Sequence, residues 1–213
     1  MVRGVLALFG GGPFTNNDEL DASLLADVGA SRAVVLPTAD AFESPGLLVS
    51  AATTWGQRLG VDVEPLMVLQ RQDAEAASAA QTVGSAGAVY LVGDSSMHLR
   101  SVLKDTAVLR SLVALLERGG LVAAVGPSAA ALCDPMLDQR GGAFTLGLGL
   151  ATGLAVVPEA ETWTPERLHR TRSLADVPLV ELPTGSAAVR RNGHWRLYGD
   201  AVSHGELEAT PSS

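Results

Sequence analysis

The chain has 213 residues, 23 acidic and 15 basic side chains, a formal net charge of −8 and one cysteine. This length suits one domain, and the shortage of Lys and Arg argues against nucleic acid or an anionic membrane as a partner, because both require a basic patch. A lone cysteine forms no intrachain disulfide, and the apolar run near the N-terminus is too short for a signal peptide. We therefore expect a soluble, cytoplasmic protein.

Short apolar runs alternate with longer amphipathic segments in the first part of the chain, which is typical of a parallel sheet with helices on both faces. The predicted strands are Val5–Phe9, Ala33–Leu36, Val61–Leu66, Ala88–Val92 and Leu121–Val125. The predicted helices are Glu19–Val28, Leu47–Leu59, Ala74–Thr82 and Ala107–Arg118. The sequence thus predicts an α/β fold in three layers, doubly wound, mostly parallel and flavodoxin-like.

The second part of the chain has shorter strand-like runs. They are Leu154–Val157, Leu179–Leu182, Ala187–Arg190 and Trp195–Tyr198, and Asn192-Gly193 between the last two predicts a hairpin. The uncharged stretch from Gly141 to Pro158 predicts a packed glycine-rich loop, because a membrane span needs about 20 continuous apolar residues. We expect residues 1–205 to form a single α/β domain and residues 206–213 to be a disordered tail.

Three predicted strands end in glycine-rich turns, at the edge where open parallel sheets bind ligands. The turns are Gly10–Gly12, Gly93–Ser96 and Gly126–Ala130. The first is a poor dinucleotide fingerprint, because Thr15 stands where the third glycine is needed, and a tight turn is the simpler interpretation. We therefore expect no cofactor.

The third turn is the most informative. A strand, then Gly126-Pro127-Ser128, then a helix of small residues is the layout of a nucleophile elbow, with Ser128 as the attacking hydroxyl. The amide after the serine and the helix N-terminus would stabilise developing negative charge. The alternative is that Ser128 only caps the helix, and Ala130 stands where the motif requires glycine.

Several motifs in order resemble the dipeptidase E and cyanophycinase family of serine peptidases. They are Leu8–Gly12, Val35–Ala39, Tyr90–Asp94, Leu121–Ala131 and Gly147–Leu150. The resemblance implies a class I glutamine-amidotransferase-like fold, a nucleophilic serine, a histidine base, an acidic partner and cleavage of short peptides or isopeptides next to aspartate.

Carried over by position, the resemblance makes Ser128 the nucleophile. It assigns the oxyanion hole and the substrate contacts to one set of residues, namely Gly11, Gly12, Gly93, Asp94, Ser95, Ala129 and Trp163. It also places Trp163 in the histidine position and Thr184 in the acid position. An indole N–H cannot accept the serine proton, and a threonine hydroxyl cannot balance an imidazolium. Normal peptidase activity is therefore expected to be disabled.

A substitute base is conceivable. His98 follows the Gly93 turn and is the best candidate, although an ordinary residue in the first turn of a helix would look the same. The other histidines, His169, His194 and His204, are expected at the surface, and none of the four has metal-ligand spacing, so no metal is expected. Cys133 is expected to be packed in a helix, which disfavours glutamine amidotransferase chemistry.

Two hypotheses of different classes remain. The first is a serine hydrolase that acts on a small peptide or amide through Ser128 with a non-standard base. The second is a catalytically silent relative, a pseudoenzyme, that binds a small peptide-like, amino-acid-like or acidic ligand or a protein partner. A homodimer stays open in either case.

Overall fold

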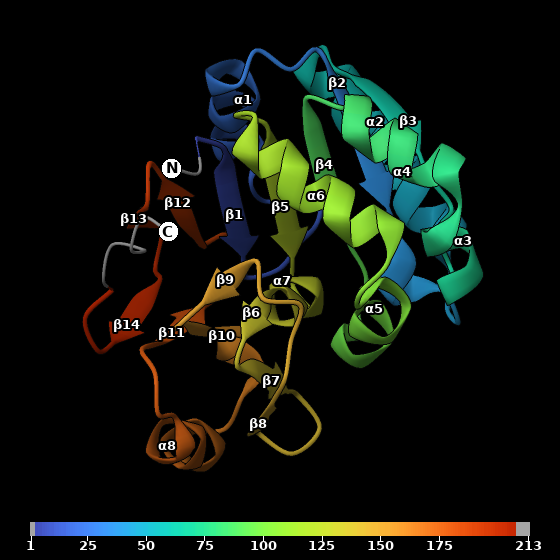
Figure 1. The fold of residues 1–213 in the computed structure, drawn as a ribbon. Coiled ribbons are helices and arrows are strands. Elements are labelled where there is room, and N and C mark those ends of the chain that lie inside the picture. Colours follow the sequence, from blue (N-terminus) through green and yellow to red (C-terminus); the bar gives the residue numbers. More distant parts are fainter. Residues whose placement is uncertain (1–2, 208–213) are drawn as a thin grey trace.

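The computed structural model describes residues 3–207. Within them, a central sheet has seven strands in the order β13-β12-β1-β5-β4-β2-β3 (Figure 1). These strands are β1 Val5–Phe9, β2 Arg32–Leu36, β3 Asp62–Pro65, β4 Ala88–Leu91, β5 Leu121–Val125, β12 Ala187–Arg191 and β13 His194–Tyr198. Strands β1 to β5 run parallel to one another. The β12–β13 hairpin pairs with β1 through β12, which is antiparallel to it. The predicted doubly wound, mostly parallel α/β fold is confirmed.

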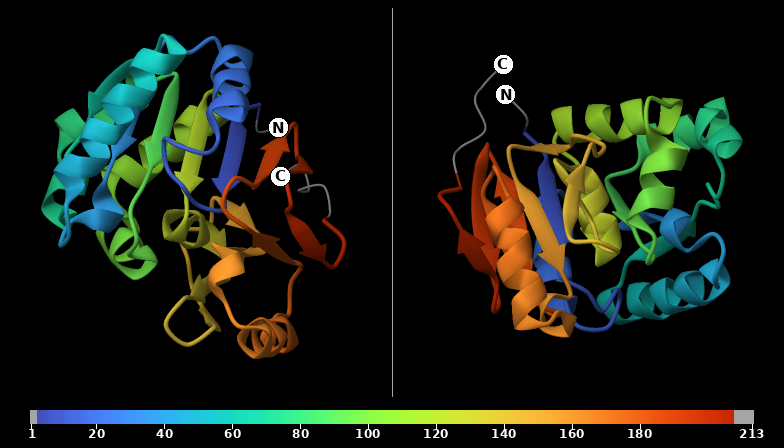
Figure 2. Two further views of the ribbon diagram at one scale, coloured as in Figure 1. Left: turned by 180° about the vertical axis from the view of Figure 1, so that it is seen from behind. Right: turned by 90° about the horizontal axis from the view of Figure 1, so that it is seen from below.

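Helices cover both faces of this sheet (Figure 2). On one face lie α1 Asp18–Asp27 and α2 Pro45–Leu59, and on the other lie α4 Ala77–Ser85, α5 Ser96–Leu103, α6 Ala107–Glu117 and α7 Pro127–Leu132. Side chains of a strand point alternately to the two faces. Accordingly, Ala123 joins the core that contains Trp55 of α2, whereas Val122 joins the core that contains Leu112 of α6.

Two predicted elements differ from the structure. The predicted helix Ala74–Thr82 is two helices, α3 Arg71–Glu75 and α4, because Ala76 between them is extended and Gln70 with Asp73 caps α3 separately. The expected loop from Gly141 to Pro158 contains two strands that were not predicted, β8 Ala143–Thr145 and β9 Ala151–Thr152, and it ends in β10 Ala155–Pro158, which matches the predicted strand Leu154–Val157. The valines of β10 are buried and pair with β11, so this stretch forms strand structure despite its glycines.

The second half of the chain builds a smaller layer below the main sheet in Figure 1. It contains β6 Cys133–Asp134, β7 Met136–Asp138, β11 Leu179–Leu182, β14 Val202–His204 and α8 Pro165–Leu174, and β10, β11 and β14 form a three-stranded sheet. The predicted hairpin at Asn192-Gly193 is present, with φ of 50° and 82° at these residues. No helix within residues 3–207 is long and apolar enough to cross a membrane.

The predicted end of the domain, residue 205, lies within the residues that the structure describes. Leu207 packs against the core, so ordered structure continues two residues beyond position 205. The rest of the predicted tail, residues 208–213, lies outside the described residues.

Candidate functional site

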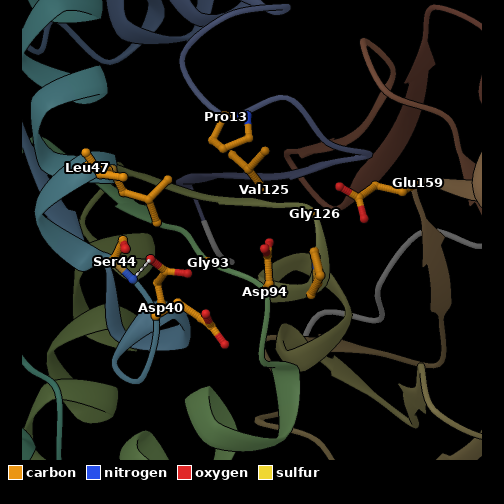
Figure 3. Close-up of a pocket in the computed structure, with 12 residues that line it drawn as sticks. Pro13, Asp40, Ser44, Leu47, Gly93, Asp94, Val125, Gly126 and Glu159 are labelled. Carbon is orange, nitrogen blue, oxygen red and sulfur yellow. Dashed lines mark hydrogen bonds between the residues drawn. The ribbon is translucent and has the colours of Figure 1, made fainter.

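A cavity of about 320 Å³ opens at the carboxyl ends of β4 and β5 (Figure 3). Its residues come from the loop after β1, from the 3-10 helix η1 Thr38–Asp40 and the start of α2, and from the residues that follow β4, β5 and β10. The lining residues are Pro13, Asp40, Glu43, Ser44, Leu47, Leu48, Gly93, Asp94, Val125, Gly126, Pro127 and Glu159. This position is where doubly wound sheets bind their ligands, and the volume is at the lower end of the range for small-molecule sites.

The cavity has an apolar part and an acidic part. Its apolar side chains are Pro13, Leu47, Leu48, Val125 and Pro127, and its acidic side chains are Asp40, Glu43, Asp94 and Glu159. Among the described residues that line the cavity there is no Lys, Arg or His. The site therefore has a negative potential without an internal counter-charge.

Gly126 occupies the tip of the turn between β5 and α7. Its φ of 62° and ψ of −137° are a conformation that side-chain-bearing residues rarely adopt. In a nucleophile elbow, the nucleophile is the residue on this sharp, strained turn from strand to helix. A Cβ placed on Gly126 would have Glu159 Oε1 as its nearest neighbour, at 3.8 Å. By backbone geometry, the tip of this turn from strand to helix is residue 126, and it holds no side chain.

The residue after the tip is Pro127, which has no backbone N–H. An elbow normally uses the N–H of the residue after the nucleophile to bind the oxyanion. The Ala129 amide, the candidate for this role, donates to the Gly126 carbonyl at 2.8 Å and is fully buried. That N–H is therefore occupied by the first turn of α7.

Ser128 is the second residue of α7 and does not line the cavity. Its side chain is fully buried, and its hydroxyl donates to the Gly93 carbonyl at 3.0 Å. This hydrogen bond ties the start of α7 to the turn after β4. The arrangement matches neither a hydroxyl presented to a ligand nor a helix cap.

His98 and Ser95 lie on or beside α5. A ring nitrogen of His98, Nε2, is 2.9 Å from the Leu69 carbonyl oxygen, and the ring contacts Phe42 edge-on at 4.7 Å between centroids. Ser95 caps α5 by accepting the His98 amide at 3.2 Å. Among the described residues, no hydrogen bond joins His98 to Ser128, so the structure does not bring the two expected catalytic residues together.

Glu159 is a cavity residue that the sequence did not reveal. It follows β10 with φ of 51°, and its backbone N–H donates to the Gly10 carbonyl at 2.9 Å. Its side chain lies against Gly11, where a Cβ would be only 2.9 Å from Glu159 Cγ. Gly11 therefore has to be glycine to leave room for this carboxylate.

Asp94 faces the same space and also lines a second, smaller cavity of about 120 Å³. Burial raises the pKa of Asp94, with further contributions from the charges of Asp40 and Glu43. Burial likewise raises the pKa of Glu159, and the charges of Asp94 and Glu161 add to the shift. Figure 3 shows both carboxylates directed toward the space beside Gly126.

The remaining candidates lie around the cavity but not in its lining. Gly12 has φ of 66° and, with Gly11, sits next to Thr184. Trp163 is nearly buried, and the Arg167 guanidinium stacks on its ring at 3.5 Å from the centroid. The residue after β10 that faces the elbow is therefore Glu159 and not Trp163.

Gly93 has φ of 117°, and a Cβ there would be 2.5 Å from the Asp40 nitrogen. This close approach of two turns requires glycine. Cys133 is fully buried, and burial raises its pKa to about 12, which fits the expected packing role. Within residues 3–207, no three His, Cys, Asp or Glu side chains are grouped to hold a metal ion.

Comparisons with known proteins agree with the motifs. No family model matches the chain. It is 26% identical to the cyanophycinases of Trichormus variabilis and of a Nostoc species over 161 residues, which is 73% of this chain and 54% of each relative. The chain thus spans about half the length of these curated relatives.

Solved structures extend the similarity over the whole fold. A peptidase from an acI-B1 Actinobacterium superposes with a TM-score of 0.84 and 25% identity, covering 98% of this chain and 92% of the other. The chain is thus similar in sequence and fold to the dipeptidase E and cyanophycinase family. A peptidase E protein from Listeria monocytogenes shares the fold at a TM-score of 0.71 and 16% identity, over 92% of this chain and 98% of the other.

Two of the acidic cavity residues carried a usable signal in the sequence. Glu159 comes directly after β10, whereas Asp40 is the last residue of η1, which follows β2, and both residues line the cavity at the carboxyl ends of β4 and β5. Assignment by the family motif drew attention to Ser128 instead, because a glycine-x-serine sequence is present. The backbone conformation that marks position 126 as the elbow tip is not visible in the residue types.

Proposed function

We propose that this chain belongs to the dipeptidase E and cyanophycinase family as a peptidase-type protein. Its cavity binds a short, positively charged, peptide-like ligand, and the protein does not form an acyl-serine intermediate. The observation that carries the proposal is the elbow itself. Gly126 at its tip has no nucleophile, Pro127 offers no amide for an oxyanion, and Ser128 is turned into the core.

The charge of the ligand follows from the acidic part of the cavity. Four carboxyl groups line the cavity, and none of its lining residues is basic. Two of them, Asp94 and Glu159, have raised pKa values because they are partly desolvated close to other negative charges. A ligand cation next to them relieves this repulsion, so its binding is favoured by charge pairing in a partly buried site.

The apolar part of the cavity argues for a ligand that is not a bare cation. Leu47, which is 71% exposed, lines the cavity together with Leu48, Pro13 and Val125. An apolar side chain next to the charged group would cover this surface and gain about 25 cal/mol for each Å² removed from water. A dipeptide with one basic and one aliphatic residue combines both features.

The binding test uses isothermal titration with lysyl-leucine and, as a neutral control of similar shape, norleucyl-leucine. We expect lysyl-leucine to bind at least tenfold more tightly, and Asp94→Asn to remove most of this difference. Glu166→Gln on the exposed face of α8 is the matched control and leaves the affinity unchanged. Equal binding of the two dipeptides, or preference for aspartyl-leucine, would overturn the proposed ligand class.

The chemical test uses a fluorophosphonate probe and intact-protein mass measurement. We expect no covalent adduct on the wild-type protein. The second candidate function is hydrolysis through Ser128, which the family relationship and the serine beside the Gly93 turn favour. An adduct that disappears in Ser128→Ala would establish that candidate and refute the proposal.

A further inference from the structure

Two carboxyl groups that line the cavity have no hydrogen-bond or ion-pair partner within residues 3–207. Among the described residues, neither Asp94 nor Glu159 has a side-chain hydrogen bond or an ion pair, whereas Asp40 accepts the Ser44 amide at 3.1 Å. Both groups are directed toward the space beside Gly126, where a side chain at the elbow tip would otherwise be. Because position 126 is glycine, this space is open to a small molecule.

We propose that Asp94 and Glu159 act as a carboxyl pair that activates a water molecule against the amide bond of the bound ligand, in the place left by the missing nucleophile. The inference rests on the proposed function, since the ligand must first occupy the cavity. It assigns to this site direct hydrolysis of a short cationic peptide, without a covalent intermediate.

The step balances within the pair. The Glu159 carboxylate takes a proton from the water while the water oxygen bonds to the amide carbon, and protonated Asp94 gives its proton to the carbonyl oxygen. In the resulting diol, the C–N bond breaks, the proton on Glu159 goes to the leaving nitrogen, and one hydroxyl proton returns to Asp94. The products are a carboxylic acid and an amine, and both side chains regain their starting protonation. Because Asp94 serves the oxygen directly, the mechanism does not require the amide that Pro127 lacks.

The electrostatics favour a state in which one of the two carboxyl groups, Asp94 or Glu159, is protonated. Two nearby carboxyl groups in a partly desolvated site resist double ionisation, which is the principle of acid–base pairs in which one member stays protonated. The charged groups that face the pair are Asp40 from η1, Glu43 from the segment before α2 and Glu161 from the 3-10 helix η2 Ala160–Thr162, and all are acidic. Each of these neighbours favours retention of one proton.

The backbone holds Glu159 in a defined position. Its N–H donates to the Gly10 carbonyl at 2.9 Å, and its carbonyl accepts the Thr162 N–H at 2.9 Å and the Thr162 hydroxyl at 2.7 Å. A left-handed φ at a residue with a side chain is unfavourable and is retained where the surroundings fix it. Glu159 is thus anchored on both sides of its Cα.

The experiment follows lysyl-leucine cleavage by mass spectrometry from pH 4 to 9, with affinity measured in parallel. We expect kcat to show a bell-shaped dependence on pH, because Glu159 must be ionised and Asp94 protonated. Both limbs of this curve lie at higher pH than ordinary carboxyl groups would give, since the pKa values of both residues are raised. Glu159→Gln should lower kcat at least 100-fold, whereas Glu159→Asp should retain a measurable rate because it keeps the carboxyl group. Glu166→Gln is the control and leaves kcat and KM unchanged.

The outcomes separate this inference from the proposed function. Cleavage that resists fluorophosphonate and is lost in Asp94→Asn and Glu159→Gln supports the inference. Binding of lysyl-leucine without cleavage overturns the carboxyl pair and leaves the proposed function standing. Absence of lysyl-leucine binding overturns both, as does cleavage that fluorophosphonate abolishes while it forms a covalent adduct on Ser128.

Discussion

Ser128 joins two turns that together shape the cavity. Its buried hydroxyl donates to the Gly93 carbonyl, and Gly93 in turn packs against the backbone of Ala39 and Asp40. The hydroxyl therefore connects α7, the end of β4 and η1 through one side chain. This structural role requires the Ser128 hydroxyl to be buried, whereas a nucleophile must be accessible to the substrate.

Ser128→Ala should accordingly lower the free energy of unfolding by about 1–3 kcal/mol, because it leaves the buried Gly93 carbonyl without this donor. Urea denaturation measures the change. Ser173→Ala removes an exposed hydroxyl that donates to the His169 carbonyl at 2.9 Å and should cost much less. Equal effects of the two substitutions would contradict the structural role of Ser128.

Asp21 is a second buried polar residue with a measurable consequence. It is 3% exposed, and its carboxylate accepts the Tyr90 hydroxyl at 2.9 Å and the Trp55 indole N–H at 3.2 Å. Burial raises its pKa to about 7, which outweighs these two donors. The folded protein therefore holds a proton on Asp21 at pH values where the unfolded chain releases it.

Because the folded-state pKa lies above the unfolded value, the stabilisation due to this proton is complete below about pH 4 and is lost as pH rises through about 7. The difference between 3.8 and about 7 corresponds to about 4 kcal/mol. We expect Asp21→Asn to gain stability relative to wild type between pH 5 and 8.5 in urea denaturation. Asp62→Asn, at an exposed site, is the control, and a pH-independent difference for Asp21→Asn would refute the raised pKa.

The site could be predicted from the sequence only in part. Glycine-rich turns after β1, β4 and β5 correctly indicated the edge of the sheet where the cavity lies, and Asp94 was placed in it. Glu159 and Asp40 were not predicted, because they follow β10 and end η1, segments that reach the cavity only through the tertiary fold. The catalytic assignment of Ser128 and His98 stays a prediction, and their positions argue for structural roles.

At the scale of elements, α8 is attached to the small sheet by one charged contact. Arg172 of α8 binds both carboxylate oxygens of Glu181 in β11, at 2.6 and 2.9 Å, and Glu181 is only 8% exposed. Bidentate pairs of this kind fix orientation as well as distance. The pair therefore determines how α8 lies against β11.

Arg172→Met should lower the free energy of unfolding by about 1–3 kcal/mol, a value reduced from that of a fully buried pair because Arg172 is partly exposed. Arg172→Lys keeps the charge and should recover part of the loss. Thermal unfolding of the three proteins checks the order. If methionine and lysine destabilise equally, the charge of residue 172 is not what holds the helix.

The main strands were predicted to within one or two residues because they combine β-branched residues, burial and a glycine at the end. The errors came where these signals conflict. Ala76 is not a helix-breaking residue type, yet its extended backbone ends α3, whose N-terminus is capped by Gln70 and Asp73. The strands β8 and β9 contain two or three residues each and depend on pairing with partners elsewhere in the chain, which local patterns do not encode.

For the whole molecule, charge is distributed to favour one kind of ligand. The net charge of −8 and the acidic cavity attract cations over distances of about a Debye length, roughly 10 Å at 0.1 M salt. Raising NaCl from 20 to 200 mM should weaken lysyl-leucine binding several-fold and leave norleucyl-leucine nearly unaffected. Titration calorimetry at the two salt concentrations measures this, and equal salt dependence would show that the cavity charge does not contribute.

Pro127, beside Gly126, affects how many substitutions would be needed to give this turn a nucleophile and an oxyanion donor. Replacing Gly126 by serine would place a hydroxyl at the strained turn. Pro127 would still have no backbone N–H to donate to a developing oxyanion. Two adjacent codons would have to mutate before either gained any catalytic benefit. Under the proposed function, an acylating enzyme therefore differs from this sequence at both positions 126 and 127, and no single substitution at this turn supplies the hydroxyl and the amide together.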